Sequence, residues 1–329
     1  MDVLSSLLST IRLNGALFLN ADMHAPWCVN IPTGAELARL LRPEAHRLAV
    51  CHLLLEGRCW IRLEDGDPIE LVAGDVVTFP RADAHVVGSD LQYSAVQVDH
   101  VVQPRVPELN RIRYGGDGEK SVVVCGWFAY DGDGSNPLTD ALPRIFRTGL
   151  RHRAAGPWIE QSIRFALAEA ASAGPGVDAL VSRAAEVLFL EALRAYIETI
   201  PPGQSGWLAG LKDAVVGRCL GLMHESPGHE WTVDALAQVL NLSRSALAER
   251  FTKYVGVPPM QYLTRWRMVV AAGQLRERRG DLARVAASVG YESEAAFNRA
   301  FKREFGTTPG QWKRRNQAAG PAESASQPH

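Results

Sequence analysis

Cysteine is scarce in this 329-residue sequence, and long hydrophobic runs are absent. The five cysteines form no CxxC pair, so we expect free thiols rather than a disulfide framework. No apolar stretch approaches the roughly 20 residues that a membrane helix needs. The N-terminal residues also lack the basic and apolar regions of a secretory signal. These absences predict a cytoplasmic protein that does not enter a membrane.

Familiar catalytic motifs are missing as well. The sequence contains no GxxxxGK phosphate loop, no GxSxG nucleophile elbow and no HExxH metal motif. Enzyme classes that depend on these motifs are therefore disfavoured.

The net charge of −1 hides an uneven distribution. Residues 207–315 carry 17 Lys and Arg against 10 Asp and Glu, whereas the rest of the chain carries 18 against 26. A basic module of this kind favours a polyanionic partner. The charge changes sign near residues 201–206, a Pro- and Gly-containing segment that we interpret as a linker. We therefore predict an N-terminal domain over residues 1–200, a basic domain over 207–315 and a disordered tail over 316–329.

The N-terminal part has the pattern of a small β domain. Short alternating runs between Arg47 and His100, separated by Gly, Asp and Pro, predict an antiparallel sandwich or barrel. One more strand is predicted over Ser121–Ala129, followed by amphipathic helices over Pro157–Ala173 and Val177–Thr199. This helical pair either mediates a homodimer or only packs on the β domain.

An internal repeat occupies the basic part of the chain. An offset of 50 residues aligns Ala237 with Ala287, Val239 with Val289, Ser243 with Ser293, Leu247 with Phe297, Phe251 with Phe301, Gly256 with Gly306, Pro259 with Pro309 and Tyr262 with Trp312. In each copy a short helix and a break precede a serine suited to an N-cap, and a second helix then ends at a glycine.

Each copy of the repeat has the plan of a helix-turn-helix unit. The paired apolar residues of its second helix face inward, which leaves a polar and partly basic outer face. In the first copy this face comprises Arg244, Ser245, Ala248, Glu249 and Arg250. In the second it comprises Glu294, Ala295, Asn298, Arg299 and Lys302. A solenoid or plain bundle is the simpler interpretation, but two copies are few for a solenoid and the positive charge favours DNA.

The repeat resembles the DNA-binding domain of the AraC/XylS transcription regulators. The residues that carry the resemblance are LARVAASVGYESEAAFNRAFKREFGTTPGQWKRR, over Leu282–Arg315, and VDALAQVLNLSRSALAERFTKYVGVPPMQYLTRWRM before them. The resemblance implies seven helices, with a connecting helix over about Met260–Arg276 that holds two recognition helices in successive major-groove turns. It also implies promoter DNA and RNA polymerase as partners.

The same resemblance implies which residues reach DNA bases. These are Ser245, Ala248 and Glu249 in the first recognition helix, and Ala295, Asn298 and Arg299 in the second. The first set departs from the long polar or basic residues often found there, because it is small or acidic. We therefore expect Arg244 and Arg250 to contribute more of the binding in the first helix.

The N-terminal part is similar to the cupin-like ligand-binding domains of some regulators of this family. The segment HLLLEGRCWIRLEDGDPIELVAGDVVTFPRADAH resembles the paired cupin motifs, and it places His52, Glu56 and His85 near positions that often hold a metal. The His-x-His of the first motif is not intact. His52 and His85 with Cys28, or with Cys51, are a candidate zinc site. The alternative is that these polar residues merely line or flank a small barrel.

Cys28 is also a candidate redox sensor. It follows Trp27 in a segment that we predict to be exposed, and an accessible thiol of low pKa can be oxidised reversibly. A cysteine is equally suited to a buried position as a small apolar residue, which we expect of Cys59 and Cys125.

The sequence as a whole predicts an α+β multidomain protein with a cupin-like β-barrel, a helical pair and an all-α double helix-turn-helix domain. The predicted function is transcription regulation, controlled by a small-molecule effector, a metal or a redox signal. The alternative is a metal-dependent cupin enzyme, a dioxygenase or isomerase, fused to a DNA-binding domain.

Overall fold

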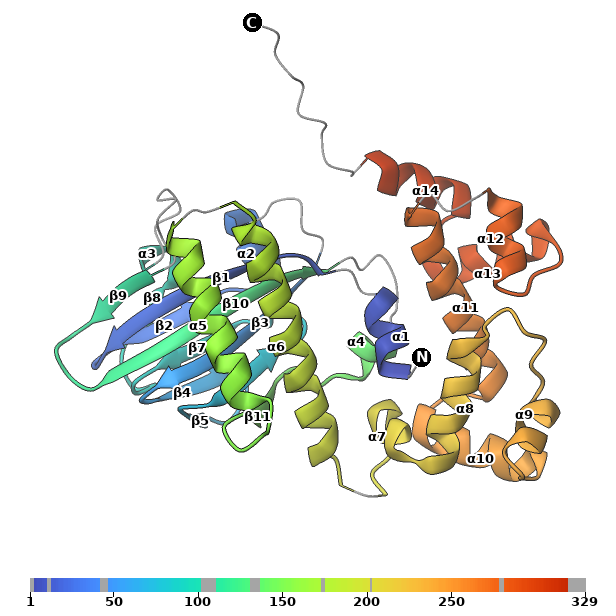
Figure 1. Cartoon of the computed structure of the whole chain (residues 1–329), viewed down its shortest axis with the longest axis horizontal. Helices are drawn as coiled ribbons and strands as arrows, with labels where there is room; N and C mark the ends of the chain where they lie inside the picture. Colours follow the sequence, from blue (N-terminus) through green and yellow to red (C-terminus); the bar gives the residue numbers. More distant parts are fainter. Residues whose placement is uncertain are drawn as a thin grey trace, which may run out of the picture. The chain divides into compact units, whose positions relative to one another are not determined.

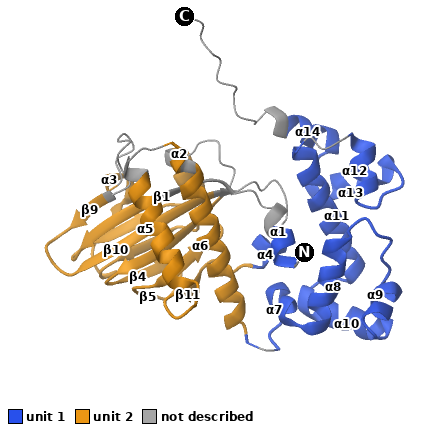
Figure 2. Cartoon of the chain, viewed as in Figure 1, with its two compact units in different colours: residues 1–11, 133–141, 201–329 blue, residues 12–132, 142–200 orange. Residues whose placement is uncertain are grey.

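The computed structural model describes residues 3–10, 13–41, 47–101, 111–130, 137–172, 175–201, 203–277 and 281–318. The chain forms two compact units, shown in separate colours in Figure 2. The sheet unit comprises residues 12–132 and 142–200, and the helical unit comprises residues 1–11, 133–141 and 201–329. Residues 1–11 and 133–141 thus group with the C-terminal helices, although the division drawn from the sequence places them in the N-terminal domain.

The sheet unit contains two β-sheets (Figure 1). The strands of the first sheet are β1 (Leu13–His24), β3 (Arg47–Glu56), β6 (Asp75–Phe79), β9 (Arg111–Gly115), β10 (Lys120–Tyr130) and β11 (Phe146–Gly149). The strands of the second sheet are β2 (Cys28–Ile31), β4 (Arg58–Leu63), β5 (Ile69–Val72), β7 (His85–Gly88) and β8 (Val96–Gln97). The two strand orders are β11-β6-β3-β10-β1-β9 and β5-β4-β7-β2-β8.

Most neighbouring strands are antiparallel, as predicted, but β1 pairs with β9 and β2 pairs with β8 in parallel. One apolar core joins the two sheets and includes Val50, Leu54, Ile61 and Phe79. Because side chains alternate along a strand, β3 directs Val50, His52 and Leu54 to this core and Cys51 to the opposite face. Two short helices, α2 (Gly34–Leu41) and α3 (Val98–Val101), complete this part of the unit.

Two long helices cover the first sheet (Figure 1). They are α5 (Gly156–Ser172) and α6 (Val177–Thr199), which confirms both predicted helices to within a residue at each end. Phe189 of α6 contacts Phe128 of β10, with ring centroids 6.0 Å apart. The outer face of this sheet is therefore apolar and covered.

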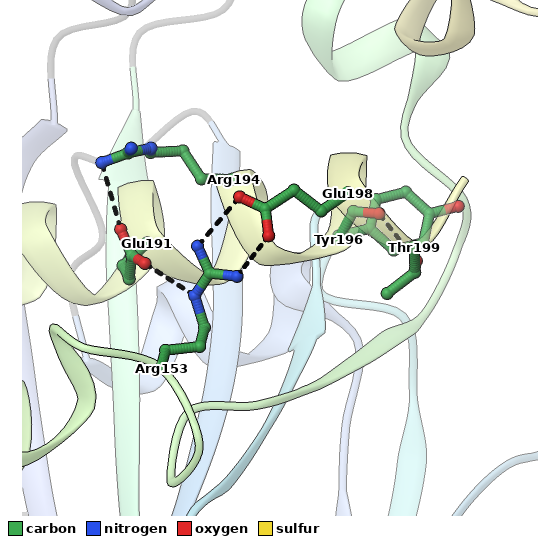
Figure 3. Close-up of polar contacts among 6 residues, drawn as sticks. All are labelled: Arg153, Glu191, Arg194, Tyr196, Glu198 and Thr199. Atoms are coloured by element: carbon green, nitrogen blue, oxygen red, sulfur yellow. Dashed lines mark hydrogen bonds and ion pairs between the residues drawn. The ribbon is translucent and has the colours of Figure 1, made fainter. Parts of the chain in front are cut away.

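An ion-pair network fixes the turn before α5 to α6 (Figure 3). Arg153 Nε donates to Glu191 Oε1 at 2.7 Å, and its terminal nitrogens donate to both carboxylate oxygens of Glu198 at 2.6 and 3.1 Å. Arg194 lies 3.4 Å from the other oxygen of Glu191. The Glu191 side chain is only 9% exposed, so its charge requires these partners.

The helical unit contains eight helices between residues 207 and 318 in the described ranges, not the seven that the family resemblance implies. They are α7 (Trp207–Lys212), α8 (Ala214–Glu225), α9 (Val233–Val239), α10 (Arg244–Val255), α11 (Pro259–Arg276), α12 (Leu282–Ser288), α13 (Glu294–Phe305) and α14 (Pro309–Ala318). The extra helix arises because Asp213 ends α7 and caps α8. The predicted tail begins three residues early, since α14 reaches Ala318, and residues 319–329 lie outside the described residues.

Two helices from earlier in the chain belong to this unit. Helix α1 (Val3–Thr10) contacts α8 and α11, and α4 (Pro137–Ala141) contacts α7. Each has a fully buried leucine, Leu7 in α1 and Leu138 in α4. Arg265 of α11 lies 3.7 Å from Asp140 of α4. Within the described ranges no helix is both long and apolar enough to cross a membrane.

Candidate nucleic-acid interface and barrel interior

The first recognition helix, α10, has the predicted caps and the predicted inner face. Ser243 Oγ accepts a hydrogen bond from the Ala246 amide at 3.2 Å, and Gly256 ends the helix in the left-handed region. Leu247 and Phe251 are fully buried. On the outer face Arg244, Ser245, Glu249 and Arg250 are exposed and Ala248 is partly exposed.

The second recognition helix, α13, repeats this arrangement with one difference. Phe297 and Phe301 are fully buried, and Gly306 ends the helix in the left-handed region. Ser293 occupies the N-cap position, but its side chain makes no capping hydrogen bond. On the outer face Glu294, Ala295, Arg299 and Lys302 are exposed, and Asn298 is partly exposed.

The basic residues of the two helices differ in their partners. Arg250 binds Asp213 with Nε 3.1 Å from Oδ1 and a terminal nitrogen 2.7 Å from Oδ2. The Asp213 carboxylate also caps α8 by accepting from the Val215 and Val216 amides at 3.0 and 2.9 Å. Burial alone would raise the pKa of Asp213, but the hydrogen bonds from Arg250 and these amides outweigh it and lower the pKa. Arg250 therefore holds α10 against the start of α8.

The remaining cations are more available to a ligand. Arg244 lies 3.4 Å from Asp234, and both side chains are more than two-thirds exposed, so the pair is weak. Arg299 and Lys302 form no ion pair with the residues that the structure describes. The second recognition helix therefore presents its positive charge freely, and the first does so mainly through Arg244.

A polar chain lies inside the sheet unit, between the two sheets. Cys125 of β10 is opposite His52 of β3 in the strand register, with Cys125 Sγ 3.0 Å from His52 Nδ1. His52 Nε2 lies 2.8 Å from His85 Nε2, and His85 Nδ1 lies 2.8 Å from the Asp83 carbonyl oxygen. His85 also stacks on Phe79, with ring centroids 3.8 Å apart.

The direction of these hydrogen bonds follows from the carbonyl at one end. Because the Asp83 carbonyl can only accept, His85 Nδ1 carries the proton, and Nε2 of the neutral ring accepts from His52. His52 Nδ1 then accepts from the Cys125 thiol. Burial, and for His52 the neighbouring His85, lowers both imidazole pKa values, that of His85 to about 4. Burial raises the pKa of the Cys125 thiol to about 12. The three hydrogen-bonded side chains, Cys125, His52 and His85, are therefore all neutral near pH 7.

Comparison with known proteins identifies both parts of the chain. A family model described as Cupin matches residues 2–198, and one described as Helix-turn-helix domain matches residues 236–315. A putative AraC-like transcription regulator of Streptomyces antibioticus is 34% identical over 95% of this chain and 99% of its own length. The chain belongs to the AraC family of transcription regulators.

Two further comparisons bear on the chain, one over nearly its full length and one over its C-terminal third. The RCS-specific HTH-type transcriptional activator RclR of Escherichia coli K12 is 30% identical over 96% of this chain and 98% of its own length. Among solved structures, a DNA-binding transcriptional dual regulator from Escherichia coli K-12 is 28% identical, and the alignment covers 33% of this chain and 96% of that one with a TM-score of 0.31. The resemblances drawn from the sequence to AraC-type regulators and to a cupin-like domain are thus confirmed.

The predicted metal ligands of this AraC-family chain are only partly brought together. His52 and His85 are in contact, but Cys28 pairs with Gly88, three residues along β7 from His85 and so about 10 Å away along the strand. Cys51 points to the other face of β3, and Glu56 lies at the surface beside Lys120. The described residues contain no group of three or more His, Cys, Asp or Glu suited to a metal. Zinc binding therefore stays a prediction. An ion bound by both histidines would have to replace the direct contact between His52 Nε2 and His85 Nε2.

The expected exposure of Cys28 is wrong. Its side chain is 3% exposed, and burial raises the pKa of its thiol, so it lacks the accessible thiolate that reversible oxidation requires. The expectation of free thiols is confirmed, since all five cysteines are unpaired and buried. The predicted burial of Cys59 and Cys125 is also confirmed.

Sequence reasoning missed two residues that organise these sites. Asp213 directly precedes the apolar start of α8, which is the place of an N-cap, and this position was a usable signal. Cys125 had no comparable signal, because its contact with His52 depends on the register of two strands that are 73 residues apart in the chain.

Proposed function

We propose that the chain binds promoter DNA by placing α10 and α13 in two successive turns of the major groove. The observation that carries this proposal is the repeat itself, since two helix-turn-helix copies with buried inner faces and exposed polar outer faces are joined by the single helix α11. At 1.5 Å per residue, the 18 residues of α11 span about 27 Å, which is comparable with the roughly 34 Å of one DNA turn. Activation through contact with RNA polymerase would follow binding.

The two helices contribute unequally in this proposal. Arg299 and Asn298 suit the guanine and adenine edges of the major groove, and Lys302 suits a phosphate. In α10 the small side chains of Ser245 and Ala248 permit close approach, while Glu249 can accept from a cytosine amine. Most of the base discrimination is therefore assigned to the second copy.

The signal is proposed to act on the cupin domain. The hydrogen bonds that join Cys125, His52 and His85 support a small-molecule or metal signal, because either ligand would disturb polar contacts between buried groups. A redox signal stays a prediction, since the Cys125 thiol is buried and burial raises its pKa. RclR, a relative of similar length, is named an RCS-specific activator. Helices α1 and α4 support a physical link to DNA binding, since both pack on the helical unit and both continue along the chain toward strands of the cupin domain.

A homodimer through α5 is a further part of the proposal. Trp158 and Phe165 are 60% and 55% exposed and lie seven residues apart, on one side of the helix. An antiparallel pair of α5 helices centred near Gln161 would place Trp158 against the partner's Phe165. The same two aromatic side chains would thus meet their counterparts on both subunits, as a two-fold interface requires.

The dimer is tested by sedimentation of full-length protein. Trp158→Glu and Phe165→Glu should each yield a monomer, whereas Val72→Glu, at a valine that is 49% exposed on β5, should leave the dimer intact. A wild-type monomer at tens of micromolar would contradict this part of the proposal alone.

The DNA proposal is tested by selecting bound genomic fragments with purified full-length protein at a stated salt concentration. A shared site with two short blocks about one helical turn apart is expected. A double variant, Arg299→Met with Lys302→Met, should select fragments that share only one of the two blocks. Parallel selections with chelator, oxidant and reductant identify the class of signal. Sequence-independent, salt-sensitive binding in every condition would refute the proposal.

A further inference from the structure

The two helix-turn-helix copies meet at a junction centred on Arg267. From α11, Arg267 Nε donates to the Pro227 carbonyl at 2.7 Å, and a terminal nitrogen donates to the His229 carbonyl at 2.8 Å. Both carbonyls belong to the loop between α8 and α9, which leads into the first copy. The guanidinium therefore fixes this loop to the connecting helix.

The same guanidinium lies against the turn of the second copy. A Cβ placed on Gly290, in the turn between α12 and α13, would be 2.9 Å from a terminal nitrogen of Arg267 and 2.8 Å from the Gly228 carbonyl. A Cβ on Gly228 would in turn be 2.6 Å from the Ser288 carbonyl. Gly290 also has a φ of +80°, which favours glycine. Backbone from both copies thus comes together at distances that only glycine permits.

The junction is half-buried. Burial lowers the pKa of Arg267 and raises that of Tyr291, which follows the turn. The carbonyls that bind Arg267 are backbone groups of one loop, so the planar guanidinium holds the backbone of that loop to α11. The internal repeat does not explain this junction. The residues 50 positions before Arg267 and Gly290 are Gly217 and Leu240, so the first copy has no equivalent contact.

We propose that Arg267 is a positioning residue that fixes the spacing between the two DNA blocks read by α10 and α13. This inference rests on the proposed function. Moving one block by a single base pair displaces it by about 3.4 Å and rotates it by about 35° around the DNA axis. Reading such a site requires one copy to swing relative to the other, and the junction prevents that movement because it pins the loop into α9 and the turn into α13 to the same point of α11.

The test measures binding of full-length protein to operators whose blocks are separated by the selected spacing or by one base pair more or less. For the wild type, we expect the altered spacings to weaken binding at least about tenfold. We call this loss of affinity at an altered spacing the spacing penalty. For Arg267→Met the spacing penalty should fall below about threefold. The affinity of this variant for the selected spacing should change by a smaller factor than the spacing penalty does. Arg267→Lys should restore part of the penalty, because an ammonium can still donate to both carbonyls.

Two further variants separate position from charge and from folding. Arg218→Met removes the same charge from an exposed site on α8 and should keep the wild-type penalty. Gly228→Ala leaves Arg267 in place but forces Gly228 and Ser288 apart, so it should also reduce the penalty. This variant decides the matter if Arg267→Met does not fold.

The inference is overturned if Arg267→Met and Gly228→Ala keep the wild-type penalty. It is also overturned if Arg267→Met weakens binding equally at every spacing, because the residue would then act through its charge. A wild-type protein that binds no pair of blocks would instead show that the proposed function has failed.

Discussion

Arg250 and Arg299 are both exposed arginines on the predicted DNA-binding face. We expect that removing one mainly lowers the stability of the protein and that removing the other mainly lowers its affinity for DNA. Arg250→Met breaks the two-pronged contact with Asp213 and should mainly destabilise the helical unit. Arg299→Met removes a cation that forms no ion pair among the described residues and should mainly weaken DNA binding. The comparison tests whether partners in the free protein predict which arginine reads DNA.

The magnitudes follow from exposure and remaining contacts. The Asp213 side chain is 7% exposed, but it keeps two backbone hydrogen bonds when Arg250 is lost, and Arg250 itself is 47% exposed. We therefore expect Arg250→Met to lower the urea midpoint of unfolding, but by less than the loss of a fully buried ion pair would. Arg299→Met should cost about 1 to 3 kcal/mol of specific binding, or roughly 5- to 150-fold in affinity.

Two measurements on each variant separate these effects. Urea denaturation of full-length protein gives the stability of the helical unit, and titration with the selected operator and a scrambled duplex at fixed salt gives affinity and specificity. Arg250→Met should shift the unfolding midpoint and change affinity less than about threefold, and Arg299→Met should do the reverse. The reasoning is refuted if Arg250→Met binds as poorly as Arg299→Met while unfolding like the wild type.

Three further predictions concern stability. Arg153→Met should destabilise the sheet unit by about 3 kcal/mol in urea denaturation, because it leaves Glu191 buried with only the longer contact to Arg194. The control Arg183→Met, which breaks the exposed pair with Glu186, should cost under about 1 kcal/mol. Equal costs for the two variants would contradict this account. Phe301→Ala should cost about 3 to 5 kcal/mol, because the ring is fully buried against Phe297 and Trp312, and an unchanged melting temperature would show that the core is wrongly assigned. Burial lowers the pKa of His224 to about 3, so the unfolded protein binds a proton at higher pH than the folded protein does. The wild type should therefore lose stability relative to His224→Phe as the pH falls from about 6.5 toward 3. A pH-independent difference between those two proteins in thermal melts would rule that out.

Local sequence signals were sufficient to predict the helical elements. Periodicity and the glycine stops located α10 and α13, and the pattern after residue 156 located α5 and α6, because helix boundaries depend on residues within a few turns. The connecting helix α11 was expected only from the family resemblance. The inner faces of the recognition helices also followed from spacing, since Leu247 and Phe251 are four residues apart. The shared core of the two sheets could be expected only in outline.

The features that the sequence did not predict depend on contacts between distant segments. The parallel pairing of β1 with β9 joins strands that are about 90 residues apart, and no local pattern specifies it. The buried position of Cys28 follows from its strand pairing with Gly88, which is 60 residues away in the chain and which no local pattern specifies. Arg250 looked free for DNA because its partner, Asp213, is 37 residues away.

The two copies of the repeat have the same backbone plan but different interiors, and this difference argues for a division of labour. The second copy packs Trp312 in an aromatic core with Phe301 and Phe305. At the equivalent position the first copy has Tyr262, whose hydroxyl lies 2.7 Å from His224 Nε2 and accepts from Trp207 at 3.2 Å.

The elements that could carry a signal meet the first copy and its neighbouring helices. Helix α1 packs on α8 and α11, α4 packs on α7, and Arg250 is already committed to Asp213 at the start of α8. The second copy instead keeps Arg299 and Lys302 available at its outer face. A signal that reaches the helical unit through α1 or α4 would therefore act first on the copy to which we assign less of the base discrimination. It would reach the other copy through α11, by way of Arg267 at the junction and of Arg265, which lies near both Asp140 of α4 and Glu304 of α13. Regulation and base recognition would then be separable by mutation, although both depend on the same connecting helix.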